Sequence, residues 1–411
     1  MRSSHVRMLA SLFVLLAAGE VSAGPRVAPH FGVRVRQEIQ PNVFWFDPEE
    51  DDRNWMRYRT QAGLCVQLRA EHALDVRLVN EFRKTYEPDT KTDYSEIVLD
   101  RLAWIWTRED GRPFALTFGR QDIVWGDGFL IRDGTSLDGS RTMYMDGIRA
   151  LLPGDRRTWD FSLMANPKRD PWVVARDKKR SLRDADQQAL ALRCFTPSGW
   201  EAALIGIGEK DPDGLRPPYN GWTLGLRREW KQASLRRGEA EVALQRKEGG
   251  EGTGLAFAWN AARARMLGKK TSGEIGFFYY SGESENFRAF RGIYGRWPKW
   301  SEMWVYSLIG EGGASEWRNL ASPYFTLRRS PLADRPALLE RLAFRATMLV
   351  PWAPEPNWED RGLLSVIELR TNLARGFSGQ LLWEWHVDGS YPKEMTENAH
   401  FMRWQIAYDL K

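Results

Sequence analysis

The sequence predicts an all-β fold, a transmembrane antiparallel β-barrel, and three observations lead to this prediction. Long segments alternate apolar and polar residues with a period of two. The connections between these segments alternate between short and long. The chain also contains 20 tryptophans, many of them near the ends of the predicted strands. Together these features are typical of a barrel in the outer membrane of a Gram-negative-type cell.

The first residues have the form of a secretory signal. Arg2 and Arg7 give it a positive start, residues 8–18 form an apolar core too short to span a bilayer, and Val21-Ser22-Ala23 is a small-residue cleavage site. We therefore expect a signal peptide over residues 1–23 and a barrel over residues 24–411. After the signal there is no run of about 18 apolar residues, which argues against a helical membrane protein.

The alternation is clearest in the first predicted strands. Residues 31–38 place apolar side chains on one face and charged side chains on the other, and residues 56–69 continue this pattern without a fault. A tilted membrane-spanning strand needs about 9–11 residues, whereas ordinary strands have about 5–6. The length of the second segment therefore favours a membrane barrel. The same alternation recurs in residues 74–78, 159–166, 239–245, 255–259 and 403–410.

The connections support the same architecture. Transmembrane barrels have short periplasmic turns and longer outer loops, an arrangement that a soluble sandwich does not require. We expect short turns at residues 70–73, 108–113, 153–157 and 196–199, and long loops around residues 84–95, 126–143, 167–186 and 209–221. After about residue 300 there is one candidate strand more than an even-numbered barrel allows, and the doubtful stretch is residues 311–336.

The tryptophans suit the two membrane interfaces, because an indole ring is apolar while its N–H needs a partner. The alternative is that they form the core of a soluble β-sandwich or a carbohydrate-binding surface. The residues that suggest an interfacial belt are Trp104, Trp106, Trp125, Trp222, Trp230, Trp300, Trp304, Trp383 and Trp404.

No catalytic or metal-binding pattern stands out. Zincin, nucleophile-elbow, Cys-x-x-Cys and Walker motifs are absent, and the five histidines have no ligand spacing. We therefore expect neither an enzyme nor a cofactor or metal. Cys65 and Cys194 are expected to be unpaired, and residues 249–254 to form a loop. The acidic run at residues 47–52 could bind a divalent cation, although a solvated loop is the simpler interpretation.

Arginine is concentrated on the polar face of the early strands. In a closed barrel this face lines the lumen, where arginine rings favour anions. The same lumen also receives Glu38, Asp75, Glu81, Glu239 and Glu241, so the arginines could equally well neutralise carboxylates in a structural network. The candidate pore-lining residues are Arg34, Arg36, Arg57, Arg59, Arg69, Arg77 and Arg101.

Several motifs resemble those of the alginate export family of outer-membrane barrels. They are Phe118-Gly119-Arg120-Gln121, Trp125-Gly126-Asp127-Gly128 and Met145-Asp146-Gly147-Ile148-Arg149. The resemblance implies an 18-stranded monomeric barrel with an electropositive pore that exports an anionic polysaccharide. It also adds Arg120 and Asp146 to the candidate substrate path.

The sequence thus predicts an outer-membrane channel for passive passage of an anionic or sugar-like solute. The expected partners are outer-membrane lipid and lipopolysaccharide, the polysaccharide or small solute, and periplasmic export proteins, with no nucleic acid. A general or nutrient-uptake porin is the alternative within the same class. From other classes, a secreted β-sandwich carbohydrate-binding protein and an outer-membrane barrel enzyme remain open.

Overall fold

In a computed structural model of the protein, the described part of the chain is residues 26–410, apart from residues 44–51, 89–92, 109, 112, 132–144, 177–184, 232–236, 251, 265–269, 286, 293–299, 308–316, 330–341 and 391–396. The predicted signal peptide lies outside the described residues, and so does the acidic run at residues 47–52 except for Asp52.

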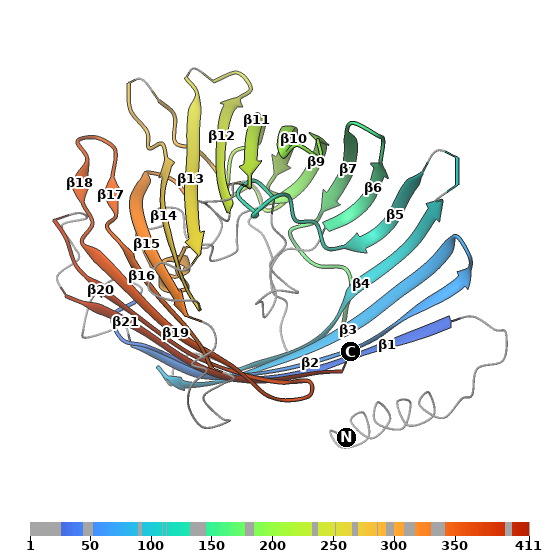
Figure 1. The fold of residues 1–411 in the computed structure, drawn as a ribbon, viewed down its shortest axis with the longest axis horizontal. Coiled ribbons are helices and arrows are strands. Elements are labelled where there is room, and N and C mark those ends of the chain that lie inside the picture. Colours follow the sequence, from blue (N-terminus) through green and yellow to red (C-terminus); the bar gives the residue numbers. More distant parts are fainter. Residues whose placement is uncertain are drawn as a thin grey trace.

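Eighteen long strands form a ring (Figure 1). They are β1 (Arg26–Gln40), β2 (Arg53–Arg69), β3 (His72–Glu87), β4 (Tyr94–Arg108), β5 (Phe114–Gln121), β6 (Met145–Leu152), β7 (Thr158–Asn166), β9 (Asp186–Phe195), β10 (Trp200–Lys210), β11 (Tyr219–Trp230), β12 (Arg237–Lys247), β13 (Gly254–Ala264), β14 (Thr271–Tyr280), β15 (Leu320–Arg329), β16 (Leu342–Leu349), β19 (Leu363–Ala374), β20 (Phe377–Val387) and β21 (Ala399–Leu410).

Each of these strands pairs antiparallel with the next, and the last pairs with the first. The closing ladder joins β21 to β1 from Leu410↔Phe31 to Met402↔Ile39. Three further strands stand outside the ring, because β8 (Val173–Arg176) pairs with the start of β4, and β17 (Trp352–Ala353) pairs with β18 (Glu359–Asp360) and with one residue of β15. The predicted 18-stranded antiparallel barrel is confirmed, and the described part of residues 311–336, which is residues 317–329, contains one ring strand, β15.

The two faces of the strands differ as the alternation predicts. On β1, Arg34, Arg36 and Glu38 are buried on the lumen side, whereas Val33 and Val35 lie on the outer side. On the outer face, large apolar side chains such as Leu224 and Leu381 are each 56% exposed. A continuous apolar surface of this kind is unfavourable in water. The barrel therefore lies in a lipid bilayer, and its fold agrees with the predicted outer-membrane location.

Aromatic side chains on the outer face gather near both ends of the barrel. Trp104 and Trp106 stack with His72 beside the turn between β2 and β3. At the other end, Trp383, Trp385 and His400 stack with interplanar angles of 2° to 8°. These are the predicted interfacial belts. Trp125, Trp300 and Trp304 do not belong to them. The prediction was wrong for these three, because they lie on loops that fold into the lumen: Trp125 and Trp304 are 4% and 0% exposed, and Trp300 stacks on the buried Phe278 at 4.1 Å.

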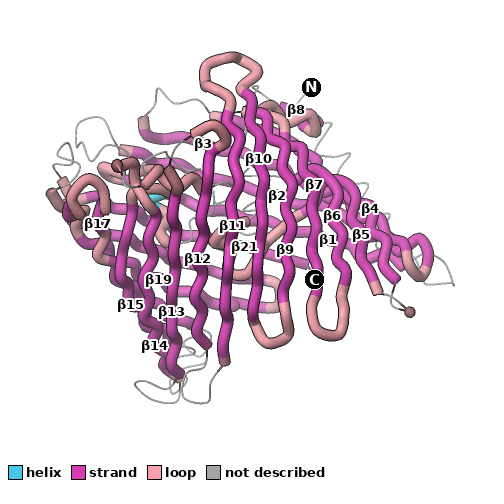
Figure 2. The backbone as a smooth tube through the Cα atoms, turned by 90° about the horizontal axis from the view of Figure 1, so that it is seen from above, coloured by secondary structure: helices cyan, strands magenta, loops and turns pink. Residues whose placement is uncertain are grey.

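The connections sort by length between the two ends of the strands (Figure 2). At the end of the barrel where β1 begins and β21 ends, the turns at residues 70–71 and 375–376 are short. At the other end, the connections at residues 122–144 and 281–319 are long. The predicted asymmetry is confirmed, although the connection expected at residues 84–95 is shorter, because β3 continues to Glu87. We refer to the short-turn end as periplasmic and the long-loop end as outer. Among the described residues, no helix is both long and apolar enough to cross a membrane.

At two glycines of the motifs, which face each other on paired strands, a larger side chain would not fit. Gly119 has φ of +115°, and Gly147 pairs with it across β5 and β6. A Cβ atom on Gly147 would lie 1.9 Å from the carbonyl oxygen of Leu163, and one on Gly119 would lie 2.2 Å from that of Leu102. The unusual turn of the backbone at Gly119 lets Phe118 face lipid while Arg120, two residues later, is buried.

We expect Gly147→Ala to destabilise the folded barrel by about 1–3 kcal/mol, because the added methyl group overlaps the backbone of β7. Heat-dependent mobility in gel electrophoresis would show this as a lower temperature of unfolding. Gly250→Ala is the matched control, since its Cβ would only reach ordinary contact, 3.4 Å from Lys247. Equal behaviour of the two variants would contradict the interpretation.

Candidate functional site

The lumen wall formed by the outer halves of β1, β2, β3 and β21 is rich in arginine. In the strand register Arg34 lies opposite Arg59, and Arg36 lies opposite Arg57. Like charges directly opposite each other destabilise a sheet unless anions compensate them. We call this surface the basic wall; its arginines are Arg34, Arg36, Arg57, Arg59, Arg83 and Arg403.

The carboxylate of Glu38 lies at the centre of the basic wall, among its arginines. Glu38 is fully buried and accepts hydrogen bonds from Arg403 at 2.6 Å and from the indole Nε1 of Trp55 at 2.6 Å. Arg36 and Arg57 approach it to 3.3 and 3.4 Å. Because one carboxylate faces three guanidinium groups, it neutralises only part of their positive charge.

The basic wall keeps an excess of positive charge among the described residues. Its six arginines face four carboxylates, those of Glu38, Glu81, Glu96 and Glu302. Glu302 comes from a loop and holds Arg403 through two hydrogen bonds of 2.7 and 2.9 Å. The basic wall therefore combines a structural network of ion pairs with two more arginines than carboxylates among these described residues.

On the opposite side of the ring, carboxylates outnumber arginines among the described residues. From β6 to β12 a chain of ion pairs runs along the lumen face, from Arg149 with Asp160 at 2.6 Å to Arg227 with Glu239 at 2.6 Å. Arg193 and Arg227 also both bind Glu201. This acidic wall consists of Arg149, Arg193, Arg227 and Arg237 against Asp160, Glu201, Glu229, Glu239 and Glu241. The lumen thus has opposite charge on its two sides.

The remaining candidate residues lie in three places: Arg77 and Arg101 on neighbouring strands, Arg69 at a turn, and Arg120 with Asp146. Arg77 binds Asp100 at 3.0 Å, and Arg101 contacts Asp75 and Asp122 at 3.2 Å each. Arg69 is exposed at the periplasmic turn, away from the basic wall. The structure therefore brings together Arg34, Arg36, Arg57 and Arg59, and places the others elsewhere in the barrel.

Arg120 and Asp146 form a node between three strands and a loop. Arg120 is 3% exposed; its Nε and Nη2 donate to the two oxygens of Asp146 at 2.6 and 2.7 Å. Its Nη1 and Nη2 donate to Asp170 at 3.2 and 2.9 Å, and Nη1 also reaches the carbonyl oxygen of Leu99 at 3.1 Å. With both edges of its guanidinium engaged, Arg120 holds the wall together rather than facing the solute path.

Two loops fold into the lumen and narrow it. The loop after β5, residues 122–131, crosses the ring: Phe129 stacks on Tyr280 of β14 at 5.4 Å, and Asp127 pairs with Arg237 of β12 at 2.9 Å. The motif Trp125–Gly128 belongs to this crossing loop. The sequence could not place it, because periodicity describes strands and not the path of a loop.

The loop between β14 and β15 crosses in the other direction. Its 3-10 turn η1 (Met303–Val305) lies against β20, where Glu384 accepts the N–H groups of Glu302 and Met303 at 3.0 Å each. Tyr306 stacks on Phe401 of β21 and contacts Trp55 of β2. Residues 300–307 therefore cover part of the basic wall. Whether loops narrow the lumen was open from the sequence, and the described segments do so.

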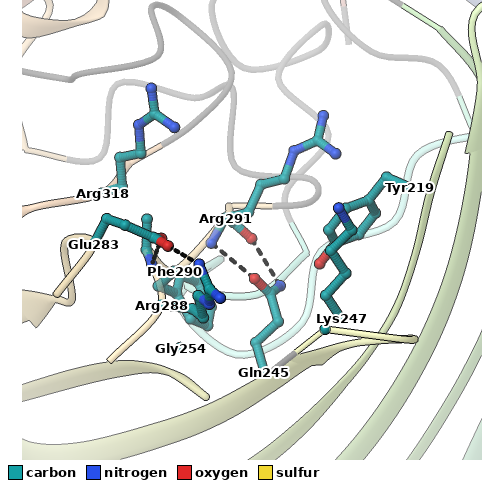
Figure 3. A pocket seen from close by; sticks show the side chains of 11 residues that line it. Tyr219, Gln245, Lys247, Gly254, Glu283, Arg288, Phe290, Arg291 and Arg318 are labelled. Atoms are coloured by element: carbon teal, nitrogen blue, oxygen red, sulfur yellow. Dashed lines mark hydrogen bonds and ion pairs between the residues drawn. The ribbon is translucent and has the colours of Figure 1, made fainter. Parts of the chain in front are cut away.

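A pocket of about 380 Å³ lies at the outer end of the barrel (Figure 3). The hydroxyl of Ser281 accepts the N–H of Leu255 at 2.9 Å and donates to the carbonyl oxygen of Arg288 at 2.6 Å, which fixes the loop 281–291 against β13. Gln245 bonds to both the N–H and the carbonyl oxygen of Arg291. The pocket is lined by Tyr219, Gln245, Lys247, Gly250, Gly254, Glu283, Arg288, Ala289, Phe290, Arg291 and Arg318.

The two cysteines are free, as expected: Cys65 lies on the lumen face of β2 and Cys194 on the lipid face of β9. Of the residues expected to form a loop at 249–254, the described residues 249, 250, 252 and 253 lie between β12 and β13 beside this pocket, whereas Gly254 is the first residue of β13. In the described part of the chain, no group of three or more histidine, cysteine, aspartate or glutamate side chains could hold a metal ion.

Comparisons with known proteins support the fold. No protein-family model matches the sequence, and no curated protein matches it. The solved structure of Acinetobacter baumannii OccAB1 is similar with a TM-score of 0.61 at 8% identity, covering 93% of this chain and 96% of that one. Pseudomonas aeruginosa OpdQ is similar with a TM-score of 0.59 at 10% identity, covering 95% and 99%.

Another similar structure, Pseudomonas aeruginosa OccK7 (OpdD), has a TM-score of 0.56 at 12% identity over 93% of this chain and 98% of that one. At such identities the likeness shows the fold alone, a closed 18-stranded antiparallel β-barrel. The alginate export family suggested by the sequence motifs is not shown by these comparisons.

Proposed function

We propose that this chain is an outer-membrane channel through which small anionic solutes diffuse. The observation that carries the proposal is the basic wall, where six described arginines, two opposed pairs among them, face four described carboxylates. Anions passing a narrowed lumen experience such an excess at short range, where screening is weak. We also propose a monomer that contacts outer-membrane lipid and lipopolysaccharide, which fits a ring that closes within one chain.

The motif resemblance further suggests an anionic polysaccharide as cargo and periplasmic export proteins as partners. The two inward loops favour a smaller cargo, because residues 122–131 and 300–307 cross the lumen from opposite sides. A nutrient-uptake porin for small organic anions is therefore the version of the function that the geometry supports best. The predicted pore residues that remain part of this proposal are Arg34, Arg57 and Arg59, which are 9%, 7% and 5% exposed, whereas Arg36 is fully buried beside Glu38 and contributes through its charge alone.

The proposal is tested by the reversal potential of the purified protein in a planar bilayer under a potassium chloride gradient. We expect chloride to permeate more readily than potassium, by about twofold to fivefold, because the acidic wall offsets part of the charge of the basic wall. Cation preference, or the absence of conductance, would overturn the proposal.

A further inference from the structure

We infer that a groove on the lipid-facing side of β6, β7 and β9 binds an acyl chain of lipopolysaccharide, with a phosphate of the same lipid beside Lys210. The inference rests on the lipid contact proposed above, which it narrows to one site, and it does not depend on channel activity. The three strands are neighbours in the ring (Figure 1), and the groove lies near their outer ends.

The groove has apolar walls and small residues between them, in a volume of about 480 Å³. Ile148, Leu163 and Leu190 lie opposite one another in a single row of paired residues across the three strands. Gly147 and Ala165 also line the groove, and their small size leaves the space that the larger side chains enclose. Van der Waals contact with an apolar chain is therefore what this surface offers.

The groove opens toward the bilayer and not toward the lumen. On β7, Leu163 and Ala165 are exposed and share the outer face with Trp159, whereas Met164 points inward and is 4% exposed. The groove is thus continuous with the lipid-facing surface of the barrel, where acyl chains are the molecules at hand. A chain that fills it gains dispersion contacts on several sides, which a chain lying on a smooth part of the wall does not.

The size of the groove fits part of one chain. Three consecutive residues of β7, from Leu163 to Ala165, line it, which corresponds to about 10 Å along the strand. Its width covers the two spacings between β6, β7 and β9, which is also about 10 Å. One or two segments of extended hydrocarbon occupy such a space.

The outer end of the groove carries polar groups that suit a phosphorylated head group. Gln188 is exposed there, opposite Ala165. Lys210 is exposed on the same face of β10 and lies diagonally from Gln188, which pairs with Gly208. Such diagonal neighbours are about 7–8 Å apart, within reach of a long side chain. An ammonium group and an amide next to an acyl chain match the phosphate of an anionic lipid.

The position of the groove identifies the lipid. The long-loop end of the barrel faces the outer leaflet, and in Gram-negative-type cells this leaflet consists of lipopolysaccharide, whose lipid part joins several acyl chains to a phosphorylated sugar. Asp186 is opposite Lys210 in the register, but one of its oxygens accepts the backbone N–H of Lys168 at 2.6 Å, so it is engaged with the loop after β7.

The inference is tested by native mass spectrometry of the full-length protein in detergent, incubated with deep-rough lipopolysaccharide or with phosphatidylglycerol. We expect one lipopolysaccharide molecule to be retained per chain, with an affinity at least about threefold higher than that for phosphatidylglycerol. Ala165→Phe fills the groove and should weaken retention by about fivefold or more. Ala202→Phe makes the same change on the lipid face of β10, outside the groove, and should have no effect.

The head-group contact is tested separately by Lys210→Gln, which should weaken retention by about fivefold. Arg246→Gln, on the lipid face of β12, is its control. Heat-dependent gel mobility shows whether each variant is folded, and Lys210→Gln decides alone if Ala165→Phe does not fold.

Three results would overturn the inference: equal retention of the two lipids, retention undiminished in the folded variants, or a second copy of the chain bound in place of lipid. The proposed channel function fails by a different result, a cation-selective reversal potential, which leaves lipid retention intact.

Discussion

Replacing Arg120 with methionine is expected to lower the free energy of unfolding by about 3–5 kcal/mol, the range observed when one partner of a buried ion pair is removed. The side chain of Asp170 is fully buried and that of Asp146 is 19% exposed, and both would lose their guanidinium partner. The loss also disconnects the carbonyl oxygen of Leu99 on β4. Denaturant unfolding in lipid vesicles, followed by tryptophan fluorescence, measures the change.

Two further variants separate charge from packing. Asp146→Asn and Asp170→Asn, combined with Arg120→Met, should recover part of the lost stability, because the two carboxylates would no longer be buried without a countercharge. Arg246→Met is the control for loss of an arginine on the outer face. If Arg120→Met were as stable as this control, the interpretation of Arg120 as a structural node would be wrong.

The fold could be predicted from the sequence because the strands of a membrane barrel alternate between lipid-facing and lumen-facing residues. Residues 56–69 alternate over the full length of β2, and the lumen and lipid faces of β1 follow directly from residues 31–38. Such alternation assigns each side chain to a face. β1 and β2 obey the assignment, whereas β5 departs from it at Gly119, where Phe118 faces lipid and Arg120 is buried. The count of 18 came from the motif resemblance, since short pairs such as β17 and β18 cannot be told from ring strands by pattern alone.

Only part of the candidate site could be predicted from the sequence, for a physical reason. Periodicity predicts that Arg34 faces inward, and the motif resemblance adds Arg120, but neither gives the partners across the ring. Arg34 lies in the basic wall, whereas Arg120 is enclosed by Asp146 and Asp170. Asp170 follows the end of β7, fifty residues after Arg120, so no local pattern joins them. The path of the loops was equally hidden, and with it the position of Trp125 and Trp304.

The charge asymmetry of the lumen follows from the same long-range arrangement. Glu239 and Glu241 were expected to neutralise arginines in general, yet they lie on the acidic wall and pair with Arg227 there. The arginines of β1 and β2 are therefore not balanced by these carboxylates. A solute that passes both walls meets regions of opposite charge balance, whose field acts on a dipolar solute as well as on a charged one.

Changing the charge of the basic wall should change ion selectivity in a direction set by the sign of the change. A unit charge about 8 Å from a permeating ion, at an effective dielectric constant of about 40, contributes about 1 kcal/mol, or about a fivefold change in relative permeability. Arg34→Gln combined with Arg59→Gln removes two positive charges and should shift permeability toward potassium by more than this factor.

Glu302→Gln should act in the opposite direction, since it removes the carboxylate that a lumen loop places on Arg403 and leaves the 2.6 Å bond between Arg403 and Glu38 in place. We expect chloride preference to rise by about fivefold. The reversal potential in a potassium chloride gradient measures both changes, and Arg246→Gln should have no effect because its side chain lies outside the lumen. Shifts of the same sign in the two lumen variants would mean that the altered loop or wall shape, rather than the charge of the basic wall, governs selectivity.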